Sequence, residues 1–151
     1  MTTEQLRHRM PPILKALKER SLRGRTPVEG LRRTECAYHG WDTVHADAAS
    51  WEPFAPGDAF GGLEAHHCFK GTVTLPEASA GKRVVCLVST GASDIWNNNN
   101  PQFLAYVDGR LVCGLDVNHN EFDLAACAVP GESHELALYV YCNTPARDVF
   151  L

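Results

Sequence analysis

Residues 103–115 read FLAYVDGRLVCGL, and they decide the class of fold. Asp108-Gly109 lies between the apolar runs YV and RLV, and both residues tolerate the positive φ angles that a two-residue hairpin turn requires. The segment therefore predicts two antiparallel strands joined at Asp108-Gly109.

Short runs of strand character continue on both sides of this hairpin. They have period-two alternation or are wholly apolar, and they cover 67–75, 83–88, 103–107, 111–113, 122–126 and 134–141. No helical pattern separates them, so six or seven strands indicate an all-β fold, an antiparallel β-sandwich of the jelly-roll type. The stretch 46–62 is rich in proline and glycine, and we expect no regular element there.

The N-terminal arm has helical character instead. We expect Thr3 to cap a first helix that ends at Pro11-Pro12, because proline removes a helical hydrogen bond. Pro12 also suits the first turn of a second, short helix with one apolar side. The apolar side chains of that second helix are Ile13, Leu14 and Leu17, and a linker is marked by Gly24, Pro27 and Gly30.

Charge also separates the arm from the body of the chain. Residues 1–33 carry nine Lys/Arg against three Asp/Glu, whereas residues 34–151 carry five against fifteen. The acidic body would repel phosphates and no nucleic-acid motif is present, so we expect no nucleic-acid partner. The basic arm is expected to pack on its own acidic body or on acidic surface elsewhere in a longer chain. The predicted units are a basic helical arm with its linker, 1–32, and a β-sandwich, 33–151.

Length and composition limit the class of protein to which the chain can belong. A chain of 151 residues with 44% hydrophobic and 21% charged residues is typical of one globular domain, which excludes wholesale disorder and collagen. No run approaches 18 apolar residues, and the N-terminus lacks the apolar region of a secretory signal. We therefore predict a cytoplasmic chain with no membrane partner.

The six cysteines form no C-x-x-C pair, so structural zinc is not indicated. A cytoplasmic chain keeps its thiols reduced, and we predict six buried or partly buried thiols. Alternation would send His66 and Cys68 to one face of a strand and His67 to the other. A metal site there would need partners such as His119 or Glu121, and because the spacing matches no usual zinc pattern we predict no metal.

Carboxylates gather at Asp116, Glu121 and Asp123, but the sequence contains no nucleophile elbow, phosphate loop or Ser/His/Asp arrangement. We therefore predict no catalytic residue. Expected loops also hold aromatic rings and amides, which suit the apolar face and the hydroxyl groups of a sugar. The candidate sugar contacts are Trp51, Trp96, Asn97 and Asn98.

Two segments resemble a known family. Residues 51–88, WEPFAPGDAFGGLEAHHCFKGTVTLPEASAGKRVVCLV, and residues 100–124, NPQFLAYVDGRLVCGLDVNHNEFDL, are similar to the N-terminal region of α-mannosidases of glycoside hydrolase family 38. The resemblance is closest to the bacterial and cytosolic/vacuolar branch and covers about residues 12–143. It is carried by Pro56-Gly57-Asp58, His67-x-Phe69, Tyr106-Val107-Asp108-Gly109 and, most specifically, the string Gly114-Leu115-Asp116 with Asn118-His119 and Glu121. Members commonly have Trp where this chain has Phe60 and Cys68, so we expect any aromatic platform there to be weakened.

The resemblance implies a galactose-binding-like β-sandwich that precedes the catalytic barrel of a retaining, zinc-dependent α-mannosidase. The zinc, held by a His-x-Asp motif, and the nucleophilic Asp belong to that barrel, so this chain is expected to be non-catalytic by itself. Its expected partners are the barrel and, through it, mannose-containing oligosaccharides, with a homo-oligomer as a further option.

Three functions remain open at this stage. The domain could pack against the barrel and shape access to it, act as an autonomous carbohydrate-binding module, or serve as a metal-bearing structural domain. For the first reading, the candidate residues at an interdomain contact or substrate entrance are Asp116, Asn118, His119, Glu121 and His67.

Overall fold

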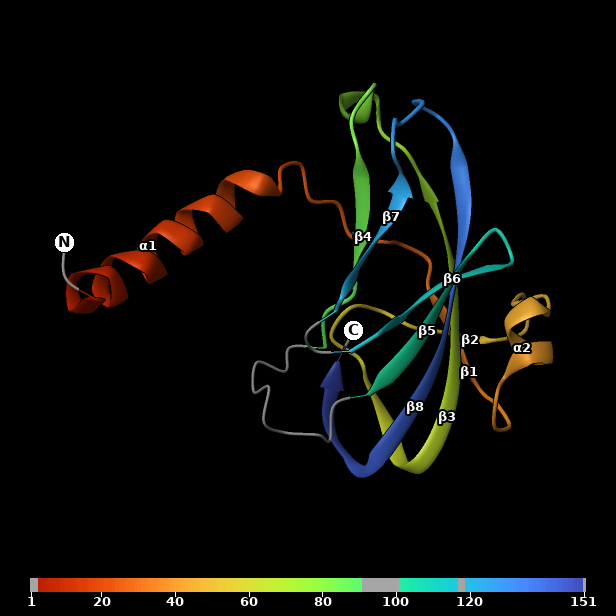
Figure 1. The fold of residues 1–151 in the computed structure, drawn as a ribbon. Coiled ribbons are helices and arrows are strands. Elements are labelled where there is room, and N and C mark those ends of the chain that lie inside the picture. Colours follow the sequence, from red (N-terminus) through yellow and green to blue (C-terminus); the bar gives the residue numbers. More distant parts are fainter. Residues whose placement is uncertain (1–2, 91–100, 117–118, 151) are drawn as a thin grey trace.

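A computed structural model describes residues 3–90, 101–116 and 119–150 of the chain. Its strands form two antiparallel sheets, preceded by one long helix (Figure 1). The six-stranded sheet has the order β2-β1-β3-β8-β5-β6, and the two-stranded sheet pairs β4 with β7. The strands are β1 Arg32–Glu35, β2 Glu52–Pro53, β3 Ala59–Thr74, β4 Val84–Leu87, β5 Gln102–Val107, β6 Arg110–Leu115, β7 Glu121–Ala125 and β8 Ser133–Phe150; the helices are α1 Thr3–Ser21, α2 Trp41–His45 and the short 3-10 helix η1 Glu77–Ser79.

The main core lies between the two sheets. Phe69 of β3, Phe103 of β5 and Val140 of β8 belong to one buried cluster with Phe122 of β7. Cys86 of β4 packs against the same cluster, so both sheets contribute their inward-facing residues to it. This arrangement is the antiparallel β-sandwich with a helical N-terminal segment that the alternation of apolar residues predicts.

A second, smaller core covers the outer face of the six-stranded sheet. Its members are Val44 of α2, Trp51, Cys68, Tyr106, Ala137 and Tyr139. Cys68 and Phe69 are neighbours on β3 but belong to different clusters, because successive strand residues point to opposite faces. Phe60 lies in the main core and Cys68 in the outer one, so these two positions do not form one aromatic platform.

The hairpin prediction at Asp108-Gly109 is confirmed. Strands β5 and β6 are paired from Val107 and Arg110, and the two turn residues have φ angles of 50° and 74°. The Asp108 carboxylate also accepts a hydrogen bond from the backbone N–H of Glu135 (2.9 Å) and lies 2.8 Å from Nδ1 of His134. The turn is therefore tied to β8 as well as to its own strands.

The expectation that 46–62 contains no regular element is wrong. Strand β2 lies in this stretch, and β3 begins at Ala59, eight residues before the predicted start. Gly61 and Gly62 have φ angles of 125° and 143°, and the pairing of β3 with β8 shifts its register on either side of Gly62. These glycines let the strand bend without leaving the sheet, which short-range pattern alone does not reveal.

The predicted break at Pro11-Pro12 is also wrong, because α1 runs without interruption from Thr3 to Ser21. The prolines remove the N–H donors for the carbonyls of Arg7 and His8, and both of these residues are exposed, so water can bind the carbonyls instead. Figure 1 shows α1 projecting away from the sandwich, and residues 3–4 and 6–17 are all exposed. The expectation that the arm packs on its own body is therefore wrong in this structure. Neither α1 nor any other described helix is long and apolar enough to cross a bilayer.

Candidate functional site

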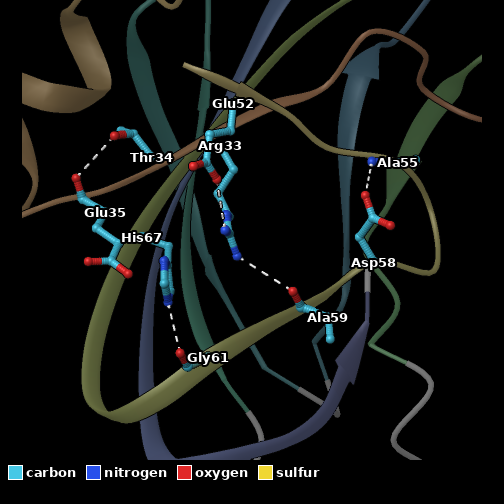
Figure 2. Close-up of polar contacts among 9 residues, drawn as sticks. All are labelled: Arg33, Thr34, Glu35, Glu52, Ala55, Asp58, Ala59, Gly61 and His67. Atoms are coloured by element: carbon cyan, nitrogen blue, oxygen red, sulfur yellow. Dashed lines mark hydrogen bonds and ion pairs between the residues drawn. The ribbon is translucent and has the colours of Figure 1, made fainter. Parts of the chain in front are cut away.

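Polar side chains gather at the edge of the six-stranded sheet, where β2, β1 and β3 meet (Figure 2). Arg33 of β1 reaches Oε2 of Glu52 on β2 at 3.1 Å, and its other terminal nitrogen donates to the carbonyl of Ala59 at 3.5 Å. The guanidinium also lies over the ring of Phe54, 5.8 Å from its centroid. Arg33 therefore links three segments of backbone and is occupied by structural contacts.

His67 lies beside this group and is almost fully buried, with 1% of its surface exposed. Its Nε2 donates to the carbonyl of Gly61 at 3.3 Å, so the proton of the neutral ring is on Nε2. Nδ1 is buried without a hydrogen-bond partner, and burial lowers the pKa of the imidazole. The neutral, enclosed imidazole supports the bend of β3 at Gly61. The structure therefore places His67, a candidate contact residue, inside the sandwich.

The loop between β6 and β7 holds the other predicted contact residues. Asp116 Oδ1 accepts from the backbone N–H of His119 at 2.7 Å, and the N–H of Asp116 donates to the carbonyl of His119 at 2.9 Å. The His119 ring lies 3.4 Å from the same carboxylate and its side chain is 82% exposed. Glu121 begins β7, opposite Leu87, while Asn118 lies outside the described residues. His119 therefore presents its imidazole to solvent between the end of β6 and the start of β7, whereas His67 lies within β3.

The candidate sugar contacts are not brought together by the described structure. Trp51 is 8% exposed and belongs to the outer core, where Lys70 Nζ lies 5.9 Å from its ring. Trp96, Asn97 and Asn98 lie outside the described residues.

Sequence reasoning missed a group of rings on the outer face of the large sheet. Tyr38 is 71% exposed and meets His66 edge-on, with 5.6 Å between ring centroids. The Tyr139 hydroxyl accepts from the backbone N–H of His39 and is hydrogen-bonded to Nδ1 of His66 at 2.7 Å. Tyr141 stacks on the same imidazole. The segment CAYHGW, 36–41, was the available signal, because three of its six residues carry rings.

A His-x-Asp triplet does occur in the chain, at His45-Ala46-Asp47, but its contacts are structural. The two ring nitrogens of His45 contact the carbonyls of Trp41 (2.8 Å) and Gly109 (3.0 Å), and these contacts raise its pKa because the doubly protonated ring can donate to both. Asp47 accepts from the N–H of Ala49. Within residues 3–90, 101–116 and 119–150, no three His, Cys, Asp or Glu side chains are grouped to hold a metal ion.

All six cysteines are free thiols, and Cys127 is exposed, so the prediction that all six are buried or partly buried is wrong at this position. The sulfur atoms of Cys36 and Cys68 lie 3.5 Å apart, and burial raises the pKa of both thiols. These thiols are therefore poor nucleophiles near neutral pH.

Comparison with known proteins gives only distant likenesses. No protein-family model and no curated protein matches the chain. A solved β-glucuronidase from Faecalibacterium prausnitzii is similar over 81% of this chain, with a TM-score of 0.47 and 18% identity, and one from Ruminococcus gnavus over 80%, with 0.43 and 11%. The chain spans only 22% of the length of either enzyme, and neither is an α-mannosidase. At these identities and TM-scores the likeness does not extend to function.

Proposed function

We propose that this chain is the non-catalytic N-terminal β-sandwich of a retaining, zinc-dependent α-mannosidase of glycoside hydrolase family 38, and that it packs against the catalytic barrel. The proposal rests on the sequence strings that resemble the family. The structural observation that supports it is the exposed imidazole of His119, whose backbone N–H donates to the Asp116 carboxylate at 2.7 Å.

The contacts between Asp116 and His119 suit these two residues to an interface between domains. The N–H of His119 donates to Oδ1 of Asp116 at 2.7 Å and the N–H of Asp116 donates to the carbonyl of His119 at 2.9 Å, so ordering these two residues costs little conformational entropy when a partner binds. With Nδ1 of His119 turned toward Asp116, Nε2 is the ring nitrogen placed to meet a carbonyl or carboxylate of the barrel. In this proposal zinc binds in the barrel, as the resemblance implies, and this domain performs no chemical step.

The test uses the longer enzyme and the isolated domain in parallel. His119→Ala should lower kcat/KM for an aryl α-mannoside, or weaken assembly, and should leave the Tm of the isolated domain nearly unchanged. Glu77→Ala is the matched control, because η1 lies toward the opposite end of the β4–β7 sheet. Full activity and assembly in the His119→Ala enzyme would refute the proposed contact.

Exposed rings favour carbohydrate binding as a second candidate function. Tyr38 and Trp41 are 71% and 59% exposed, and imidazoles lie close to both rings. Titration with mannose and mannobiose, followed by tryptophan fluorescence, should then show saturable binding that Tyr38→Ala and Trp41→Ala weaken. Leu63→Ala removes an equally exposed apolar side chain elsewhere and serves as the control.

A further inference from the structure

Helix α1 carries an apolar face that no described residue covers. Its five large apolar side chains recur every three or four residues and are all exposed: Leu6 39%, Met10 47%, Ile13 51%, Leu14 49% and Leu17 58%. At 3.6 residues per turn they occupy about one third of the helix circumference. Most of the stability of a helix in a protein comes from packing of its apolar face, so this apolar stripe needs a partner surface.

Basic residues border the stripe. By the same periodicity, Arg7 lies along one edge and Arg9 along the other, whereas Glu4 lies on the far side. Residues 3–21 hold five Lys/Arg against two Asp/Glu. A surface that receives α1 should therefore be apolar at its centre and acidic around it.

The outer face of the β4–β7 sheet has this character. Leu87 is 40% exposed and pairs with Glu121, and Val85 pairs with Asp123. Their neighbours Cys86 and Phe122 point into the main core, so these four side chains point away from it. Asp123 already forms an ion pair with Arg83 at 2.6 Å, so Glu121, beside Leu87, is the acidic residue of β7 that would meet the basic border of α1. Five residues of β7 extend about 17 Å at 3.4 Å per residue. The stripe from Leu6 to Leu17 is also about 17 Å long at 1.5 Å per residue.

The charges on α1 and on the body of the chain indicate which molecule supplies the surface that α1 contacts. Two α1 stripes facing each other would bring basic borders together, which disfavours helix–helix pairing. The body of the chain, residues 34–151, carries fifteen Asp/Glu against five Lys/Arg and attracts a basic helix. In its own molecule α1 projects away from the sandwich (Figure 1).

We propose that α1 docks on the outer β4–β7 face of a second copy of this chain, and that two copies exchange helices about a two-fold axis. Each helix then covers Leu87 of the partner subunit and sets its basic border against the acidic residues around it. Reciprocal exchange closes the assembly at two copies. The proposal goes beyond the function proposed above and does not depend on it.

Sedimentation equilibrium of the 151-residue chain tests the exchange. Between about 1 and 200 μM a monomer–dimer equilibrium is expected, and Leu14→Asp or Leu87→Asp should weaken it by at least about tenfold, since each buries a charge in the apolar contact. His8→Asp, on the far side of α1, and Leu111→Asp, on β6, are the matched controls and should leave it unchanged. Raising the salt concentration from about 0.1 to 0.5 M should also weaken the dimer.

Three results would overturn the proposal. One is a monomer at every concentration, and another is a dimer that Leu14→Asp leaves intact. The third is a chain that stays monomeric but sediments with anionic phosphatidylserine vesicles, which would identify a membrane surface as the partner of α1. Circular dichroism melts of each variant show whether it is folded. The α1 variants should fold normally, because the exposed helix lies clear of the sandwich.

Discussion

At the scale of single residues, buried polar groups in this protein support the fold. His67, a candidate contact residue, is an example. Its ring is enclosed between strands, and one of its ring nitrogens has no hydrogen-bond partner. The half-exposed carboxylates of Asp116 and Asp108 also bind backbone N–H groups, of His119 in the same loop and of Glu135 in β8 respectively. In this structure, the short sequence motifs that carry the resemblance to a family of α-mannosidases mainly form turns.

His67 predicts a pH dependence of stability. Burial lowers its folded-state pKa below the ordinary value of 6.5, so between these two pKa values the unfolded chain binds a proton that the native chain does not. The free energy of unfolding should therefore fall as the pH drops below about 6.5. His67→Leu should flatten this dependence in urea titrations at pH 5 to 7 and change stability at pH 7 by only about 1 kcal/mol, the net value of one hydrogen bond. An unchanged pH profile in the variant would contradict this account.

Thiol reactivity is also a property of single residues. Cys127 is exposed, whereas burial raises the pKa of Cys86 and Cys142 to about 11. In the native protein Cys127 should react first with a disulfide reagent, and Cys86 and Cys142 only on unfolding. Without reductant, denaturant should release six thiols, and Cys127→Ser should remove the fast phase. A count of four or fewer would show that disulfides form.

At the scale of elements, local sequence predicted most strands but not their full lengths. The hairpin β5–β6 depends on two adjacent residues and was predictable from them. Strand β3 and helix α1 are longer than predicted, because glycines allow a bend and prolines in an exposed helix do not end it. Helix α2 was missed, since five residues give too short a pattern and Val44 is held by the outer core.

The β5–β6 turn gives a prediction at this scale. Gly109 has a φ angle of 74°, which costs an L-residue about 1 to 2 kcal/mol, so Gly109→Ala should lower the free energy of unfolding by about that amount. Gly114→Ala in β6 is the control, because its added Cβ would meet only ordinary contacts, the nearest at 3.8 Å. Equal effects of the two substitutions in chemical denaturation would argue against strain at the turn.

At the scale of the whole molecule, the proposed function places the zinc and the nucleophilic Asp in a separate catalytic barrel. The isolated chain is therefore expected not to hydrolyse an aryl α-mannoside, with or without added zinc. A preparation free of contaminating mannosidase is needed for this assay. Turnover that persists in it, and that disappears in His45→Ala or Asp47→Ala, would show that the His-x-Asp triplet of this chain is catalytic.

The sequence by itself determined the all-β class, the hairpin at Asp108-Gly109 and the basic character of the arm, because alternation, turn propensity and charge act over a few residues. Only the tertiary structure decided that His67 and Trp51 are buried and that Asp116 holds its own loop. It also decided that Tyr38 and His66 meet on the outer face and that α1 stands clear of the sandwich. These facts depend on contacts between segments far apart in the chain, and local patterns carry no information about which distant surfaces meet.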